Sequence, residues 1–298
     1  MKIGLVTVTF NSELVLFDFL QSVNKQDYTD YRLYVVDNDS SDKTSDILDK
    51  DPSLKVIYNK TNVGVAKANN QGIKLALDDG CDLILLVNND TIFESKLLTK
   101  LIHAYQKGSA SIVVPKMKYH DSKKIWFAGG FFNPKKAFLN YHIGQGDEDN
   151  NQFADRLIDY APICCSLVHK KVFEEIGFFD EKYFVYFDDA DFFYRLKKDG
   201  RFKTLYINDV EFYHKIGSLS KSRTSKNSNK YSPFFIKQMT RNHVYFLRKQ
   251  KSIFFDFLLV YLLAYFLLRF FISSNFSKDL KTFKLIISSY FSGFKIKL

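Results

Sequence analysis

Short apolar segments alternate with helical segments along the first part of the chain. Residues 3–8, 33–36, 54–58 and 83–87 are rich in Val, Ile and Leu. Strands that are apolar on both faces and separated by helices typically form a parallel sheet that is covered on both sides. The sequence therefore predicts an α/β fold, with a mostly parallel sheet and helices on both of its faces.

Helical periodicity and capping residues mark several of the intervening segments. We expect helices over 13–24, 42–50, 65–77 and 95–105, and two more over 189–198 and 236–251. The stretch 215–231 is rich in Ser, Lys and Asn, which favours a loop.

The net charge of +10 is unevenly distributed along the 298 residues. Between Glu211 and Asp256 there is no acidic residue, whereas ten Lys or Arg side chains fall there. A basic block of this kind suits phosphate, nucleic acid or an anionic membrane. The three cysteines form no CxxC pair, which fits a reducing compartment and excludes a disulfide framework or a zinc finger.

Polar side chains follow three of the apolar runs, where the strands are expected to end. Thr9 and Asn11 follow the first run, Asp37 follows the second, and Asp90 follows the fourth in LLVNNDT. In open α/β sheets, ligands bind at the carboxyl ends of the strands. A single Asp after a strand is usually a cap or turn residue, but three such sites at one edge indicate a binding site.

The segment Asn62-Val63-Gly64 lies between these sites and directly precedes a predicted helix that carries Lys67. Gly64 permits close approach of the backbone, and a helix N-terminus favours an anion. The chain has no GxxxxGK[ST], GxGxxG or HExxH motif. P-loop, dinucleotide-binding and zinc-protease interpretations are therefore unsupported.

The segment YFDDADFFYR, residues 186–195, places three carboxylates among aromatic side chains. Like charges in an apolar setting raise carboxyl pKa values and cost stability. The dipole at a helix N-terminus favours acidic residues, which accounts for one or two aspartates but not for the aromatic surroundings. Perturbed carboxyl groups are typical of catalytic sites, so we expect catalysis here. Arg195 is placed to pair with Asp191, one helical turn away.

Several segments occur in the order and spacing of one enzyme family: TVTFNS, VVDNDSSD, NVGVAKANNQG, LLVNNDT, GFFDEKYFVYFDDADFFYRLKKDG and HKIGS. Over residues 1–250 the chain resembles the family 2 inverting glycosyltransferases, most closely the bacterial rhamnosyltransferase-like members that build surface polysaccharides. The resemblance implies a GT-A fold, with a Rossmann-like nucleotide-sugar-binding half at 1–115 and an acceptor-binding half at 116–250.

The resemblance also implies a UDP- or dTDP-sugar as the donor. Asp37 would accept a hydrogen bond from a pyrimidine N–H of the base. The other nucleotide-binding residues that it implies are Thr9, Asn11, Asn62, Lys67 and Asn89.

The DxD metal motif of the family corresponds to Asn88-Asn89-Asp90, in which only Asp90 is a carboxylate. Asp90 would hold a divalent cation, Mn²⁺ or Mg²⁺, on the diphosphate oxygens. His214 matches a family histidine that reaches this metal, and an imidazole suits Mn²⁺ somewhat better than Mg²⁺. Because Asn88 is neutral, we expect a modest metal affinity.

Asp189 matches the general base of the family. It would take the proton from an acceptor hydroxyl as that oxygen attacks the anomeric carbon, and the diphosphate would leave from the opposite face with inversion. Asp188, Asp191 and Arg195 would support the base, and Asp180 would contact the acceptor or brace its loop. The expected sugar is rhamnose, galactofuranose or a similar hexose, and the expected acceptor is a lipid-linked or growing surface polysaccharide.

Two other functions compete with this interpretation. A nucleotidyltransferase acting on sugar phosphates also uses a nucleotide and a metal, but it would need a carboxylate pair where this chain offers Asn88 and Asp90. A basic nucleic-acid-binding protein would suit the charge block, but no RRM, KH or helix-turn-helix pattern is present. We therefore expect no nucleic-acid partner.

The segment 251–298 is predicted to form a membrane-associating helical tail. Residues 253–272 are long enough to span a bilayer, but they contain Asp256 and Arg269. Amphipathic helices in the membrane interface suit the pattern better, and a helix pair packed on the protein is the alternative. We expect anionic lipid to hold the tail, which places the protein peripherally on the cytoplasmic face of the plasma membrane. Arg241-Asn242 would then meet the phosphate of a lipid-linked acceptor.

Overall fold

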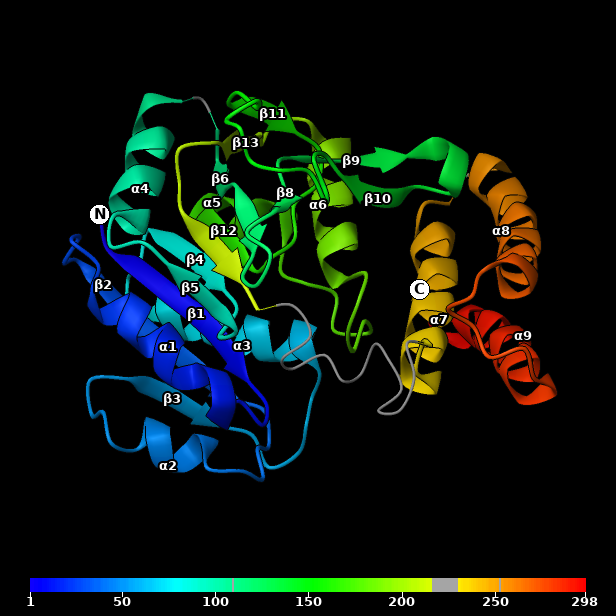
Figure 1. Cartoon of the computed structure of the whole chain (residues 1–298), viewed down its shortest axis with the longest axis horizontal. Coiled ribbons are helices and arrows are strands. Elements are labelled where there is room, and N and C mark those ends of the chain that lie inside the picture. The colour runs from blue at the N-terminus through cyan, green and yellow to red at the C-terminus, as the bar shows by residue number, and fades with distance from the viewer. Residues whose placement is uncertain (109, 216–229, 252) are drawn as a thin grey trace.

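The computed structural model describes residues 1–108, 110–215, 230–251 and 253–298. A sheet with its covering helices occupies the N-terminal part, and the C-terminal helices form the opposite end of the molecule (Figure 1). The predicted loop at 215–231 falls almost entirely outside the described residues.

The central sheet has the strand order β11-β13-β6-β12-β4-β1-β2-β3. Its first strands along the chain pair in parallel: β1 (Ile3–Thr9), β2 (Tyr31–Asp37), β3 (Lys55–Tyr58) and β4 (Leu83–Val87). The other half contains the parallel pair β6 (Ile112–Pro115) and β13 (Thr204–Ile207), with β12 (Cys165–His169) and β11 (Arg156–Ile158) antiparallel to their neighbours. The predicted mostly parallel α/β sheet is confirmed.

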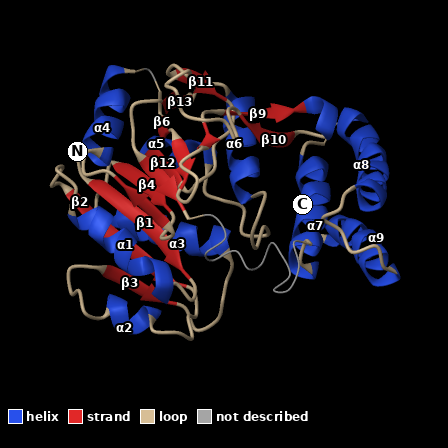
Figure 2. Cartoon of the chain, viewed as in Figure 1, coloured by secondary structure: helices blue, strands red, loops and turns tan. Residues whose placement is uncertain are grey.

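Helices lie on both sides of this sheet (Figure 2). They are α1 (Glu13–Asn24), α2 (Thr44–Leu48), α3 (Val65–Asp78), α4 (Leu97–Lys107), α5 (Lys170–Ile176) and α6 (Asp188–Asp199). Helix α3 packs on β1 and β2, and α4 packs on β6. The facing side chains of the strands, such as Leu5, Leu85 and Val113, are fully buried, and burial of apolar surface of this kind is the main favourable term in folding.

A smaller sheet brings residues 212–214 back to the segment that follows β4. It consists of β5 (Thr91–Phe93), β14 (Phe212–His214), β7 (Met117–Tyr119) and β8 (Ile125–Phe127). Because β14 pairs antiparallel with β5 and His214 lies opposite Thr91, a residue late in the chain reaches the segment that follows β4. A hairpin of β9 (Gly130–Asn133) and β10 (Leu139–His142) extends toward the C-terminal helices.

The C-terminal helices are α7 (Pro233–Lys249), α8 (Ile253–Ile272) and α9 (Leu280–Lys295). Helix α9 packs closely on α7 at Gly293, where a Cβ atom would lie 2.6 Å from the carbonyl oxygen of Arg241. Arg248 Nη1 donates to the carbonyl oxygens of Gly293 and Ile296. By length and composition α8 is the one helix of the described chain that is apolar enough to cross a membrane, but it also packs on α7.

Helix α7 holds the backbone of the loop that precedes α6. Asn242 Nδ2 donates to the carbonyl oxygens of Val185 and Tyr186, at 2.9 and 2.8 Å, and Arg241 Nη2 donates to that of Lys182. Asn242 is buried and Arg241 is partly buried. The loop carbonyl groups need donors that no strand or helix of their own supplies. The Asn242 side chain is therefore committed to the loop, and the expected contact of Arg241 with an acceptor phosphate stays a prediction.

Lys249, at the end of α7, joins this loop to α6. Its Nζ lies 2.8 Å from Asp180 Oδ2 and 2.6 Å from Asp191 Oδ1. Tyr245 also donates to Asp180 Oδ2, at 2.8 Å. Burial raises the pKa of Asp180, but the hydrogen bond and the charge of Lys249 outweigh burial, so the pKa lies below its usual value.

We expect Lys249→Met to lower the free energy of unfolding by about 3 kcal/mol at pH 7, because it removes the cation shared by the buried Asp191 and the partly buried Asp180. Chemical denaturation monitored by circular dichroism measures this change. The difference in unfolding free energy between the wild type and the variant should shrink as the pH falls below about 4. There, protonation of Asp180 removes the stabilisation that its ion pair with Lys249 gives the wild type.

Lys237→Met is the matched control, since Lys237 is an exposed lysine on the same helix. It should change the stability by less than about 0.5 kcal/mol. Equal effects of the two substitutions would show that Lys249 contributes nothing through its two ion pairs.

Candidate active site

Asp37 connects the carboxyl ends of β1 and β2. Its buried carboxylate accepts hydrogen bonds from Thr9 Oγ1 at 2.7 Å, from Ser40 Oγ at 2.6 Å and from the Ser40 backbone N–H at 3.1 Å. A carboxylate has about four acceptor positions, so Oδ2 can accept one more donor. The predicted neighbourhood of Thr9 and Asp37 is confirmed, and the contact with a nucleotide base stays a prediction.

Asn11 and Asn62 shape the loops beside Asp37. Asn11 is exposed at a positive φ of 52°, and its Oδ1 accepts from the Ser41 backbone N–H. Asn62 Oδ1 accepts from Asn38 Nδ2 and from the Gly64 N–H. Lys67 is exposed on the first turn of α3. The predicted nucleotide-binding residues therefore gather at one edge of the sheet, and their nucleotide contacts stay predictions.

Asn89 lies beneath this edge. Its side chain is buried, and Nδ2 donates to the carbonyl oxygen of Val8 at 2.6 Å and to Ser12 Oγ at 3.2 Å. It thereby joins the ends of β4 and β1. Asn89 Oδ1 is buried without a hydrogen-bond partner in the part of the chain that the structure describes, so a direct nucleotide contact would have to use that atom.

Asp90 and His214 meet as the sequence predicted. His214 Nε2 lies 3.0 Å from Asp90 Oδ1, and both side chains are largely buried. His214 Nδ1 is buried and has no hydrogen-bond partner among the described residues, so this nitrogen keeps its bonding capacity for another group. A carboxylate oxygen next to an imidazole nitrogen is a donor set that suits a divalent cation such as Mn²⁺.

No group of three or more His, Cys, Asp or Glu side chains that could hold a metal occurs within the described ranges. The protein would thus supply Asp90 and His214, and phosphate oxygens and water would complete the coordination. Mg²⁺ sites that serve substrate phosphates are commonly built in this way, with one or two carboxylates. The residues present therefore fit the metal that the sequence predicts.

The turn before α6 positions the acidic residues at the start of the helix. Tyr186 and Phe187 both have positive φ, at 64° and 70°, which is an unfavourable conformation for bulky residues. The turn ends at Asp188 and Asp189, the first residues of α6. Asp188 is buried and Asp189 is half-buried. Asp189 is therefore the carboxylate of the pair that a substrate reaches more readily.

Tyr160 holds Asp189 in place. Its hydroxyl donates to Asp189 Oδ2 at 2.7 Å, while the backbone N–H of Ala190 donates to Oδ1 at 2.7 Å. Burial raises the pKa of Asp189, and these two hydrogen bonds act in the opposite direction because they stabilise the ionised form.

The two neighbouring carboxyl groups form a coupled pair. Burial, and then the charges of Asp189 and Asp191, raise the pKa of Asp188 to about 8. Two adjacent buried carboxyl groups share a proton more readily than they ionise together. The hydrogen bond from the Tyr160 hydroxyl favours the ionised form of Asp189, which makes Asp189 the candidate base of the pair.

Asp191 and Arg195 bind α6 to the neighbouring parts of the protein. Arg195 Nε donates to Asp191 Oδ2 at 3.0 Å, as predicted, and its two other nitrogens donate to the carbonyl oxygens of Ile176 and Phe178. Asp191 is almost fully buried and also contacts Lys249. Asp180 braces the loop through the same lysine. These predicted supporting residues therefore position the base from within the protein.

The N-terminus of α3 holds the same loop from the other side. The Val65 N–H donates to the carbonyl oxygen of Phe184 at 2.7 Å, and a Cβ atom on Gly64 would lie 2.5 Å from that oxygen. The predicted anion position at this helix N-terminus is thus covered by Phe184. Asn70, whose role the sequence did not reveal, pairs with both the N–H and the carbonyl oxygen of Phe179.

A series of ring contacts connects Asp189, through Tyr160, to the Asp90–His214 pair. Tyr160 stacks on His142, with ring centroids 5.9 Å apart, His142 contacts Trp126 at 5.1 Å, and Trp126 contacts His214 at 4.8 Å. Burial lowers the pKa of His142 to about 4, so this imidazole is neutral at pH 7. Tyr160, His142 and Trp126 lie in the irregular middle of the sequence, where no motif marked them.

Cys164 is buried beside the end of β4. Burial raises the pKa of its thiol, and the charges of Asp90 and Asp189 are among those that raise it further. Its carbonyl oxygen accepts from the backbone N–H of Asn88, at the end of β4. Together with the ring contacts from Tyr160 to His214, these interactions place Asp189 and the Asp90–His214 pair in one region of the structure.

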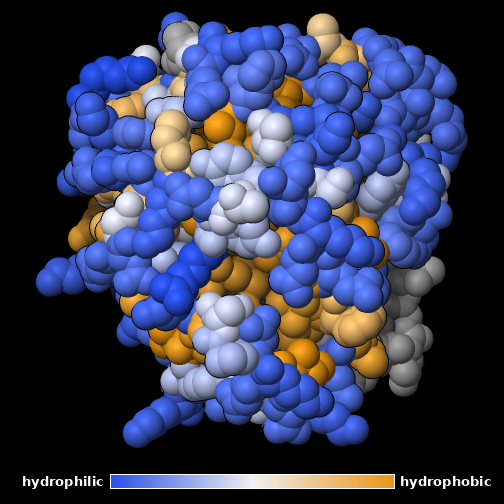
Figure 3. All heavy atoms as spheres, turned by 90° about the vertical axis from the view of Figure 1, so that its left-hand side faces the viewer, coloured by the Kyte–Doolittle hydropathy of each residue, from blue (hydrophilic) through white to orange (hydrophobic). Residues whose placement is uncertain are grey.

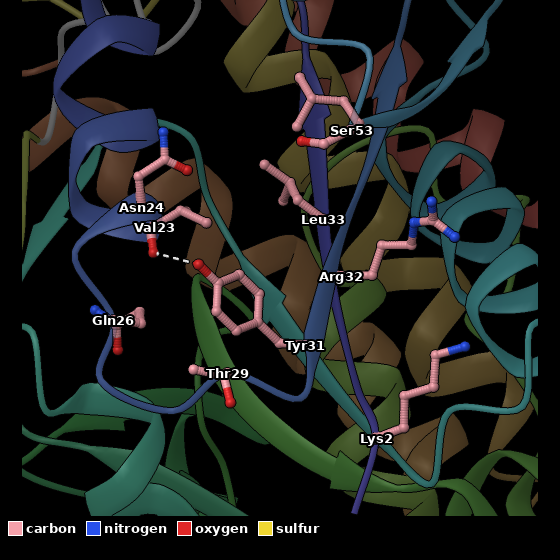
Figure 4. Close-up of a pocket in the computed structure, with 10 residues that line it drawn as sticks. Lys2, Val23, Asn24, Gln26, Thr29, Tyr31, Arg32, Leu33 and Ser53 are labelled. Carbon is pink, nitrogen blue, oxygen red and sulfur yellow. Dashed lines mark hydrogen bonds between the residues drawn. The ribbon is translucent and has the colours of Figure 1, made fainter.

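A hollow of about 620 Å³ lies elsewhere on the surface. Lys2, Tyr31 and Arg32 line it at the amino ends of β1 and β2, and Tyr31 donates to the Val23 carbonyl oxygen (Figure 4). Because ligands of such sheets bind at the carboxyl ends, we do not assign this hollow to the active site.

The N-terminal side of the molecule is mostly hydrophilic, with some hydrophobic residues showing between the hydrophilic ones (Figure 3).

Two curated relatives are similar to this chain. The dTDP-rhamnosyl transferase RfbF of Shigella flexneri is 27% identical over 246 residues, which is 82% of this chain and 79% of the relative. The UDP-Glc:alpha-D-GlcNAc-diphosphoundecaprenol beta-1,3-glucosyltransferase WfgD of Escherichia coli is 27% identical over 140 residues, 46% of this chain and 53% of the relative.

Solved structures share the fold. Staphylococcus aureus TarS 1–349 in complex with UDP-GlcNAc matches with a TM-score of 0.58 at 18% identity, over 97% of this chain and 79% of that one. The mannosyltransferase PcManGT of Pyrobaculum calidifontis, in complex with GDP-Man and Mn²⁺, matches with a TM-score of 0.56 at 14% identity, over 84% and 64%. The predicted GT-A fold is confirmed. The model of the family described as glycosyl transferase family 2 matches residues 5–177, more than half of the chain, and the protein with this carboxyl-edge site therefore belongs to that family.

Proposed function

We propose that the protein transfers a hexose, such as rhamnose or galactofuranose, from a UDP- or dTDP-sugar to a hydroxyl group of a lipid-linked or growing surface polysaccharide, with inversion. The observation that carries this proposal is the geometry around Asp189. It is a half-buried carboxyl group, with one oxygen bound by the Tyr160 hydroxyl and the other by Ala190 N–H. Ring contacts through Tyr160, His142 and Trp126 link it to the Asp90–His214 pair.

The base step follows from these positions. Asp189 takes the proton of the acceptor hydroxyl while that oxygen forms a bond to the anomeric carbon. The bond from this carbon to the diphosphate oxygen breaks with its electron pair, and the nucleoside diphosphate leaves from the opposite face. General-base assistance of this kind contributes about 10²- to 10⁴-fold to the rate. Burial keeps the pKa of Asp189 above its usual value, which makes it a stronger base.

Asp90 and His214 would hold the divalent cation, Mn²⁺ or Mg²⁺. When bound, the cation supplies neutralisation of the diphosphate charge that develops as the donor bond breaks. Binding of Mn²⁺ together with GDP-Man in PcManGT supports this assignment. The residues at the ends of β1 and β2, with Asp37 at their centre, are the proposed nucleotide site, which the complex of TarS with UDP-GlcNAc supports.

Named relatives support the donor and acceptor classes. RfbF is a dTDP-rhamnosyl transferase, and WfgD acts on a diphosphoundecaprenol-linked sugar. These names support rhamnose among the donor sugars and a lipid-linked glycan among the acceptors. We further propose the cytoplasmic face of the plasma membrane as the working place, where nucleotide sugars and such acceptors would meet.

The two competing functions have less support. A nucleotidyltransferase needs a carboxylate pair on its metal, whereas the described residues place only Asp90 beside His214. Among the described cations of the basic block, Arg241, Arg248 and Lys249 bind backbone carbonyls and carboxylates of the protein, whereas Lys237 is exposed. We propose sugar transfer as the function and expect no nucleic-acid partner.

Asp189→Asn should lower kcat for sugar transfer by about 10³-fold, because the amide cannot accept the proton, and should leave the Kd for the nucleoside diphosphate within about twofold. Transfer from UDP-glucose, UDP-GlcNAc, UDP-galactofuranose and dTDP-rhamnose to a bacterial lipid extract measures the first effect, and calorimetry measures the second. Asp199→Asn, which replaces a partly exposed, ion-paired acid at the other end of α6, is the control and should retain activity. Full activity of Asp189→Asn would exclude it as the base.

Tyr160→Phe should move the acidic limb of the kcat/KM pH profile to higher pH by about one unit. Removal of the hydroxyl deletes a hydrogen bond to the ionised Asp189, worth about 1.5–3 kcal/mol for a charged acceptor, so the pKa of Asp189 rises further and more base is protonated at a given pH. Tyr206→Phe, in which a buried hydroxyl that bonds Asn208 is removed, serves as the control with an unchanged profile. An unshifted limb in Tyr160→Phe would contradict the role of Tyr160.

Asp90→Ala should abolish the metal dependence of nucleotide binding. We expect Mn²⁺ to tighten UDP or dTDP binding to the wild-type protein at least tenfold in calorimetry, and to have no effect on the variant, because the only carboxylate of the metal pair is gone. His103→Ala, which replaces an exposed histidine on α4, should behave as wild type. Failure of both nucleotides to bind the wild type with any metal would overturn the proposed function.

A further inference from the structure

Helix α8 carries a continuous apolar stripe on its outer face. Phe257, Val260 and Ile272 are between 71 and 73% exposed, although they are large apolar residues. The full set of exposed large apolar side chains on α8 is Phe254, Phe257, Val260, Tyr261, Leu268, Phe271 and Ile272. Their spacing of three and four residues places them along one side of a helix of 20 residues, about 30 Å long. Large exposed apolar patches mark interaction sites.

The opposite face of α8 is bound to the protein. Phe255, Leu258, Leu259 and Leu262 are buried within the main hydrophobic core. The β9–β10 hairpin supports the helix from the side, since Phe138 contacts Phe255 with ring centroids 5.0 Å apart and Tyr261 donates to the Lys135 carbonyl oxygen. A helix that spans a bilayer would lose these contacts. The structure therefore favours a helix that lies on a surface.

Exposed lysine side chains lie on the elements next to the apolar stripe of α8. Helix α9 exposes Phe291 and Phe294 together with Lys281, Lys284 and Lys295. Lys135 and Lys136 are exposed at the end of the hairpin, beside α8. Over residues 251–298 there are seven Lys or Arg and two Asp. Protein–protein interfaces are depleted in Lys, whereas helices that bind membranes combine Phe and Leu with lysines.

We infer that α8 and α9 form a docking surface for an anionic phospholipid bilayer. The aromatic and aliphatic side chains of α8 enter the boundary between headgroups and acyl chains, and the lysines of α9 and of the hairpin contact the anionic headgroups. Both helices lie in the plane of the membrane, and α7, which carries them, faces away from it. This inference concerns binding and does not depend on the identity of the transferred sugar.

The full-length protein is tested by co-sedimentation with phosphatidylcholine vesicles and with vesicles that contain 30% phosphatidylglycerol. The wild type should bind the anionic vesicles, with binding weakened by 0.5 M NaCl because salt screens the lysine contacts. The triple variant Phe257→Gln, Leu268→Gln, Phe271→Gln should bind at least tenfold more weakly, since it removes apolar groups that enter the bilayer. The pair Lys281→Gln, Lys284→Gln should bind about tenfold more weakly at low salt.

The matched control is Leu14→Gln, Phe17→Gln on α1. These residues are as exposed as those of α8, at 87 and 65%, but they lie in the N-terminal part of the molecule. This variant should bind vesicles like the wild type. Unchanged thermal unfolding and nucleotide binding would show that all variants are folded, so that a loss of vesicle binding reports the surface itself.

Three outcomes would overturn the inference. The first is equal vesicle binding by the wild type and the triple variant, or no binding by either. The second is a wild-type dimer that the triple variant converts to a monomer, without vesicle binding, which would assign the stripe to a second copy of the chain. The third is resistance to extraction by alkaline carbonate, which would indicate a spanning helix. A protein that binds vesicles but transfers no sugar would keep this inference and overturn the proposed function.

Discussion

The geometry of the active site depends on how one irregular segment satisfies its backbone carbonyl groups. The loop before α6 forms no strand or helix, yet its carbonyl groups are close to buried side chains and need donors. Helix α3 supplies the Val65 N–H to Phe184, and α7 supplies Asn242 to Val185 and Tyr186. Elements from both ends of the chain thus contact one loop. Their combined hydrogen bonds to this loop fix the position of Asp189.

This arrangement allows an ionised carboxylate to exist in a mostly aromatic setting. Burial disfavours charge on Asp188 and Asp189 alike, but only Asp189 receives the hydroxyl of Tyr160. The difference between the two residues therefore lies in a single side-chain donor from a distant part of the chain. Asp191, by contrast, is balanced by Arg195 and Lys249. Three aspartates on one helix turn have three different environments.

Much of the fold and of the site was predictable from the sequence. The parallel strands and the pairing of Asp191 with Arg195 follow from local patterns, because burial on both faces and helical spacing are visible in a few consecutive residues. The meeting of Asp90 with His214 followed from the family resemblance. Tyr160 was not predictable, since its contact with Asp189 depends on a tertiary pairing that no motif encodes. The contacts of Arg241-Asn242 were equally unpredictable. From the sequence alone, a basic side chain on this helix is interpreted as a ligand for phosphate. Only the packed structure shows that these side chains bind backbone carbonyl groups.

The close packing of α9 on α7 at Gly293 has a practical consequence for making a soluble enzyme. Shortening the chain before α8 would remove α9, which packs closely on α7 at Gly293, and α7 is the helix that holds the loop in front of Asp189. A shortened protein would lose sugar transfer for reasons unrelated to lipid. Polar substitution of the outward-facing side chains keeps α7 supported, and it is the route by which solubility can be gained without altering the catalytic carboxylate.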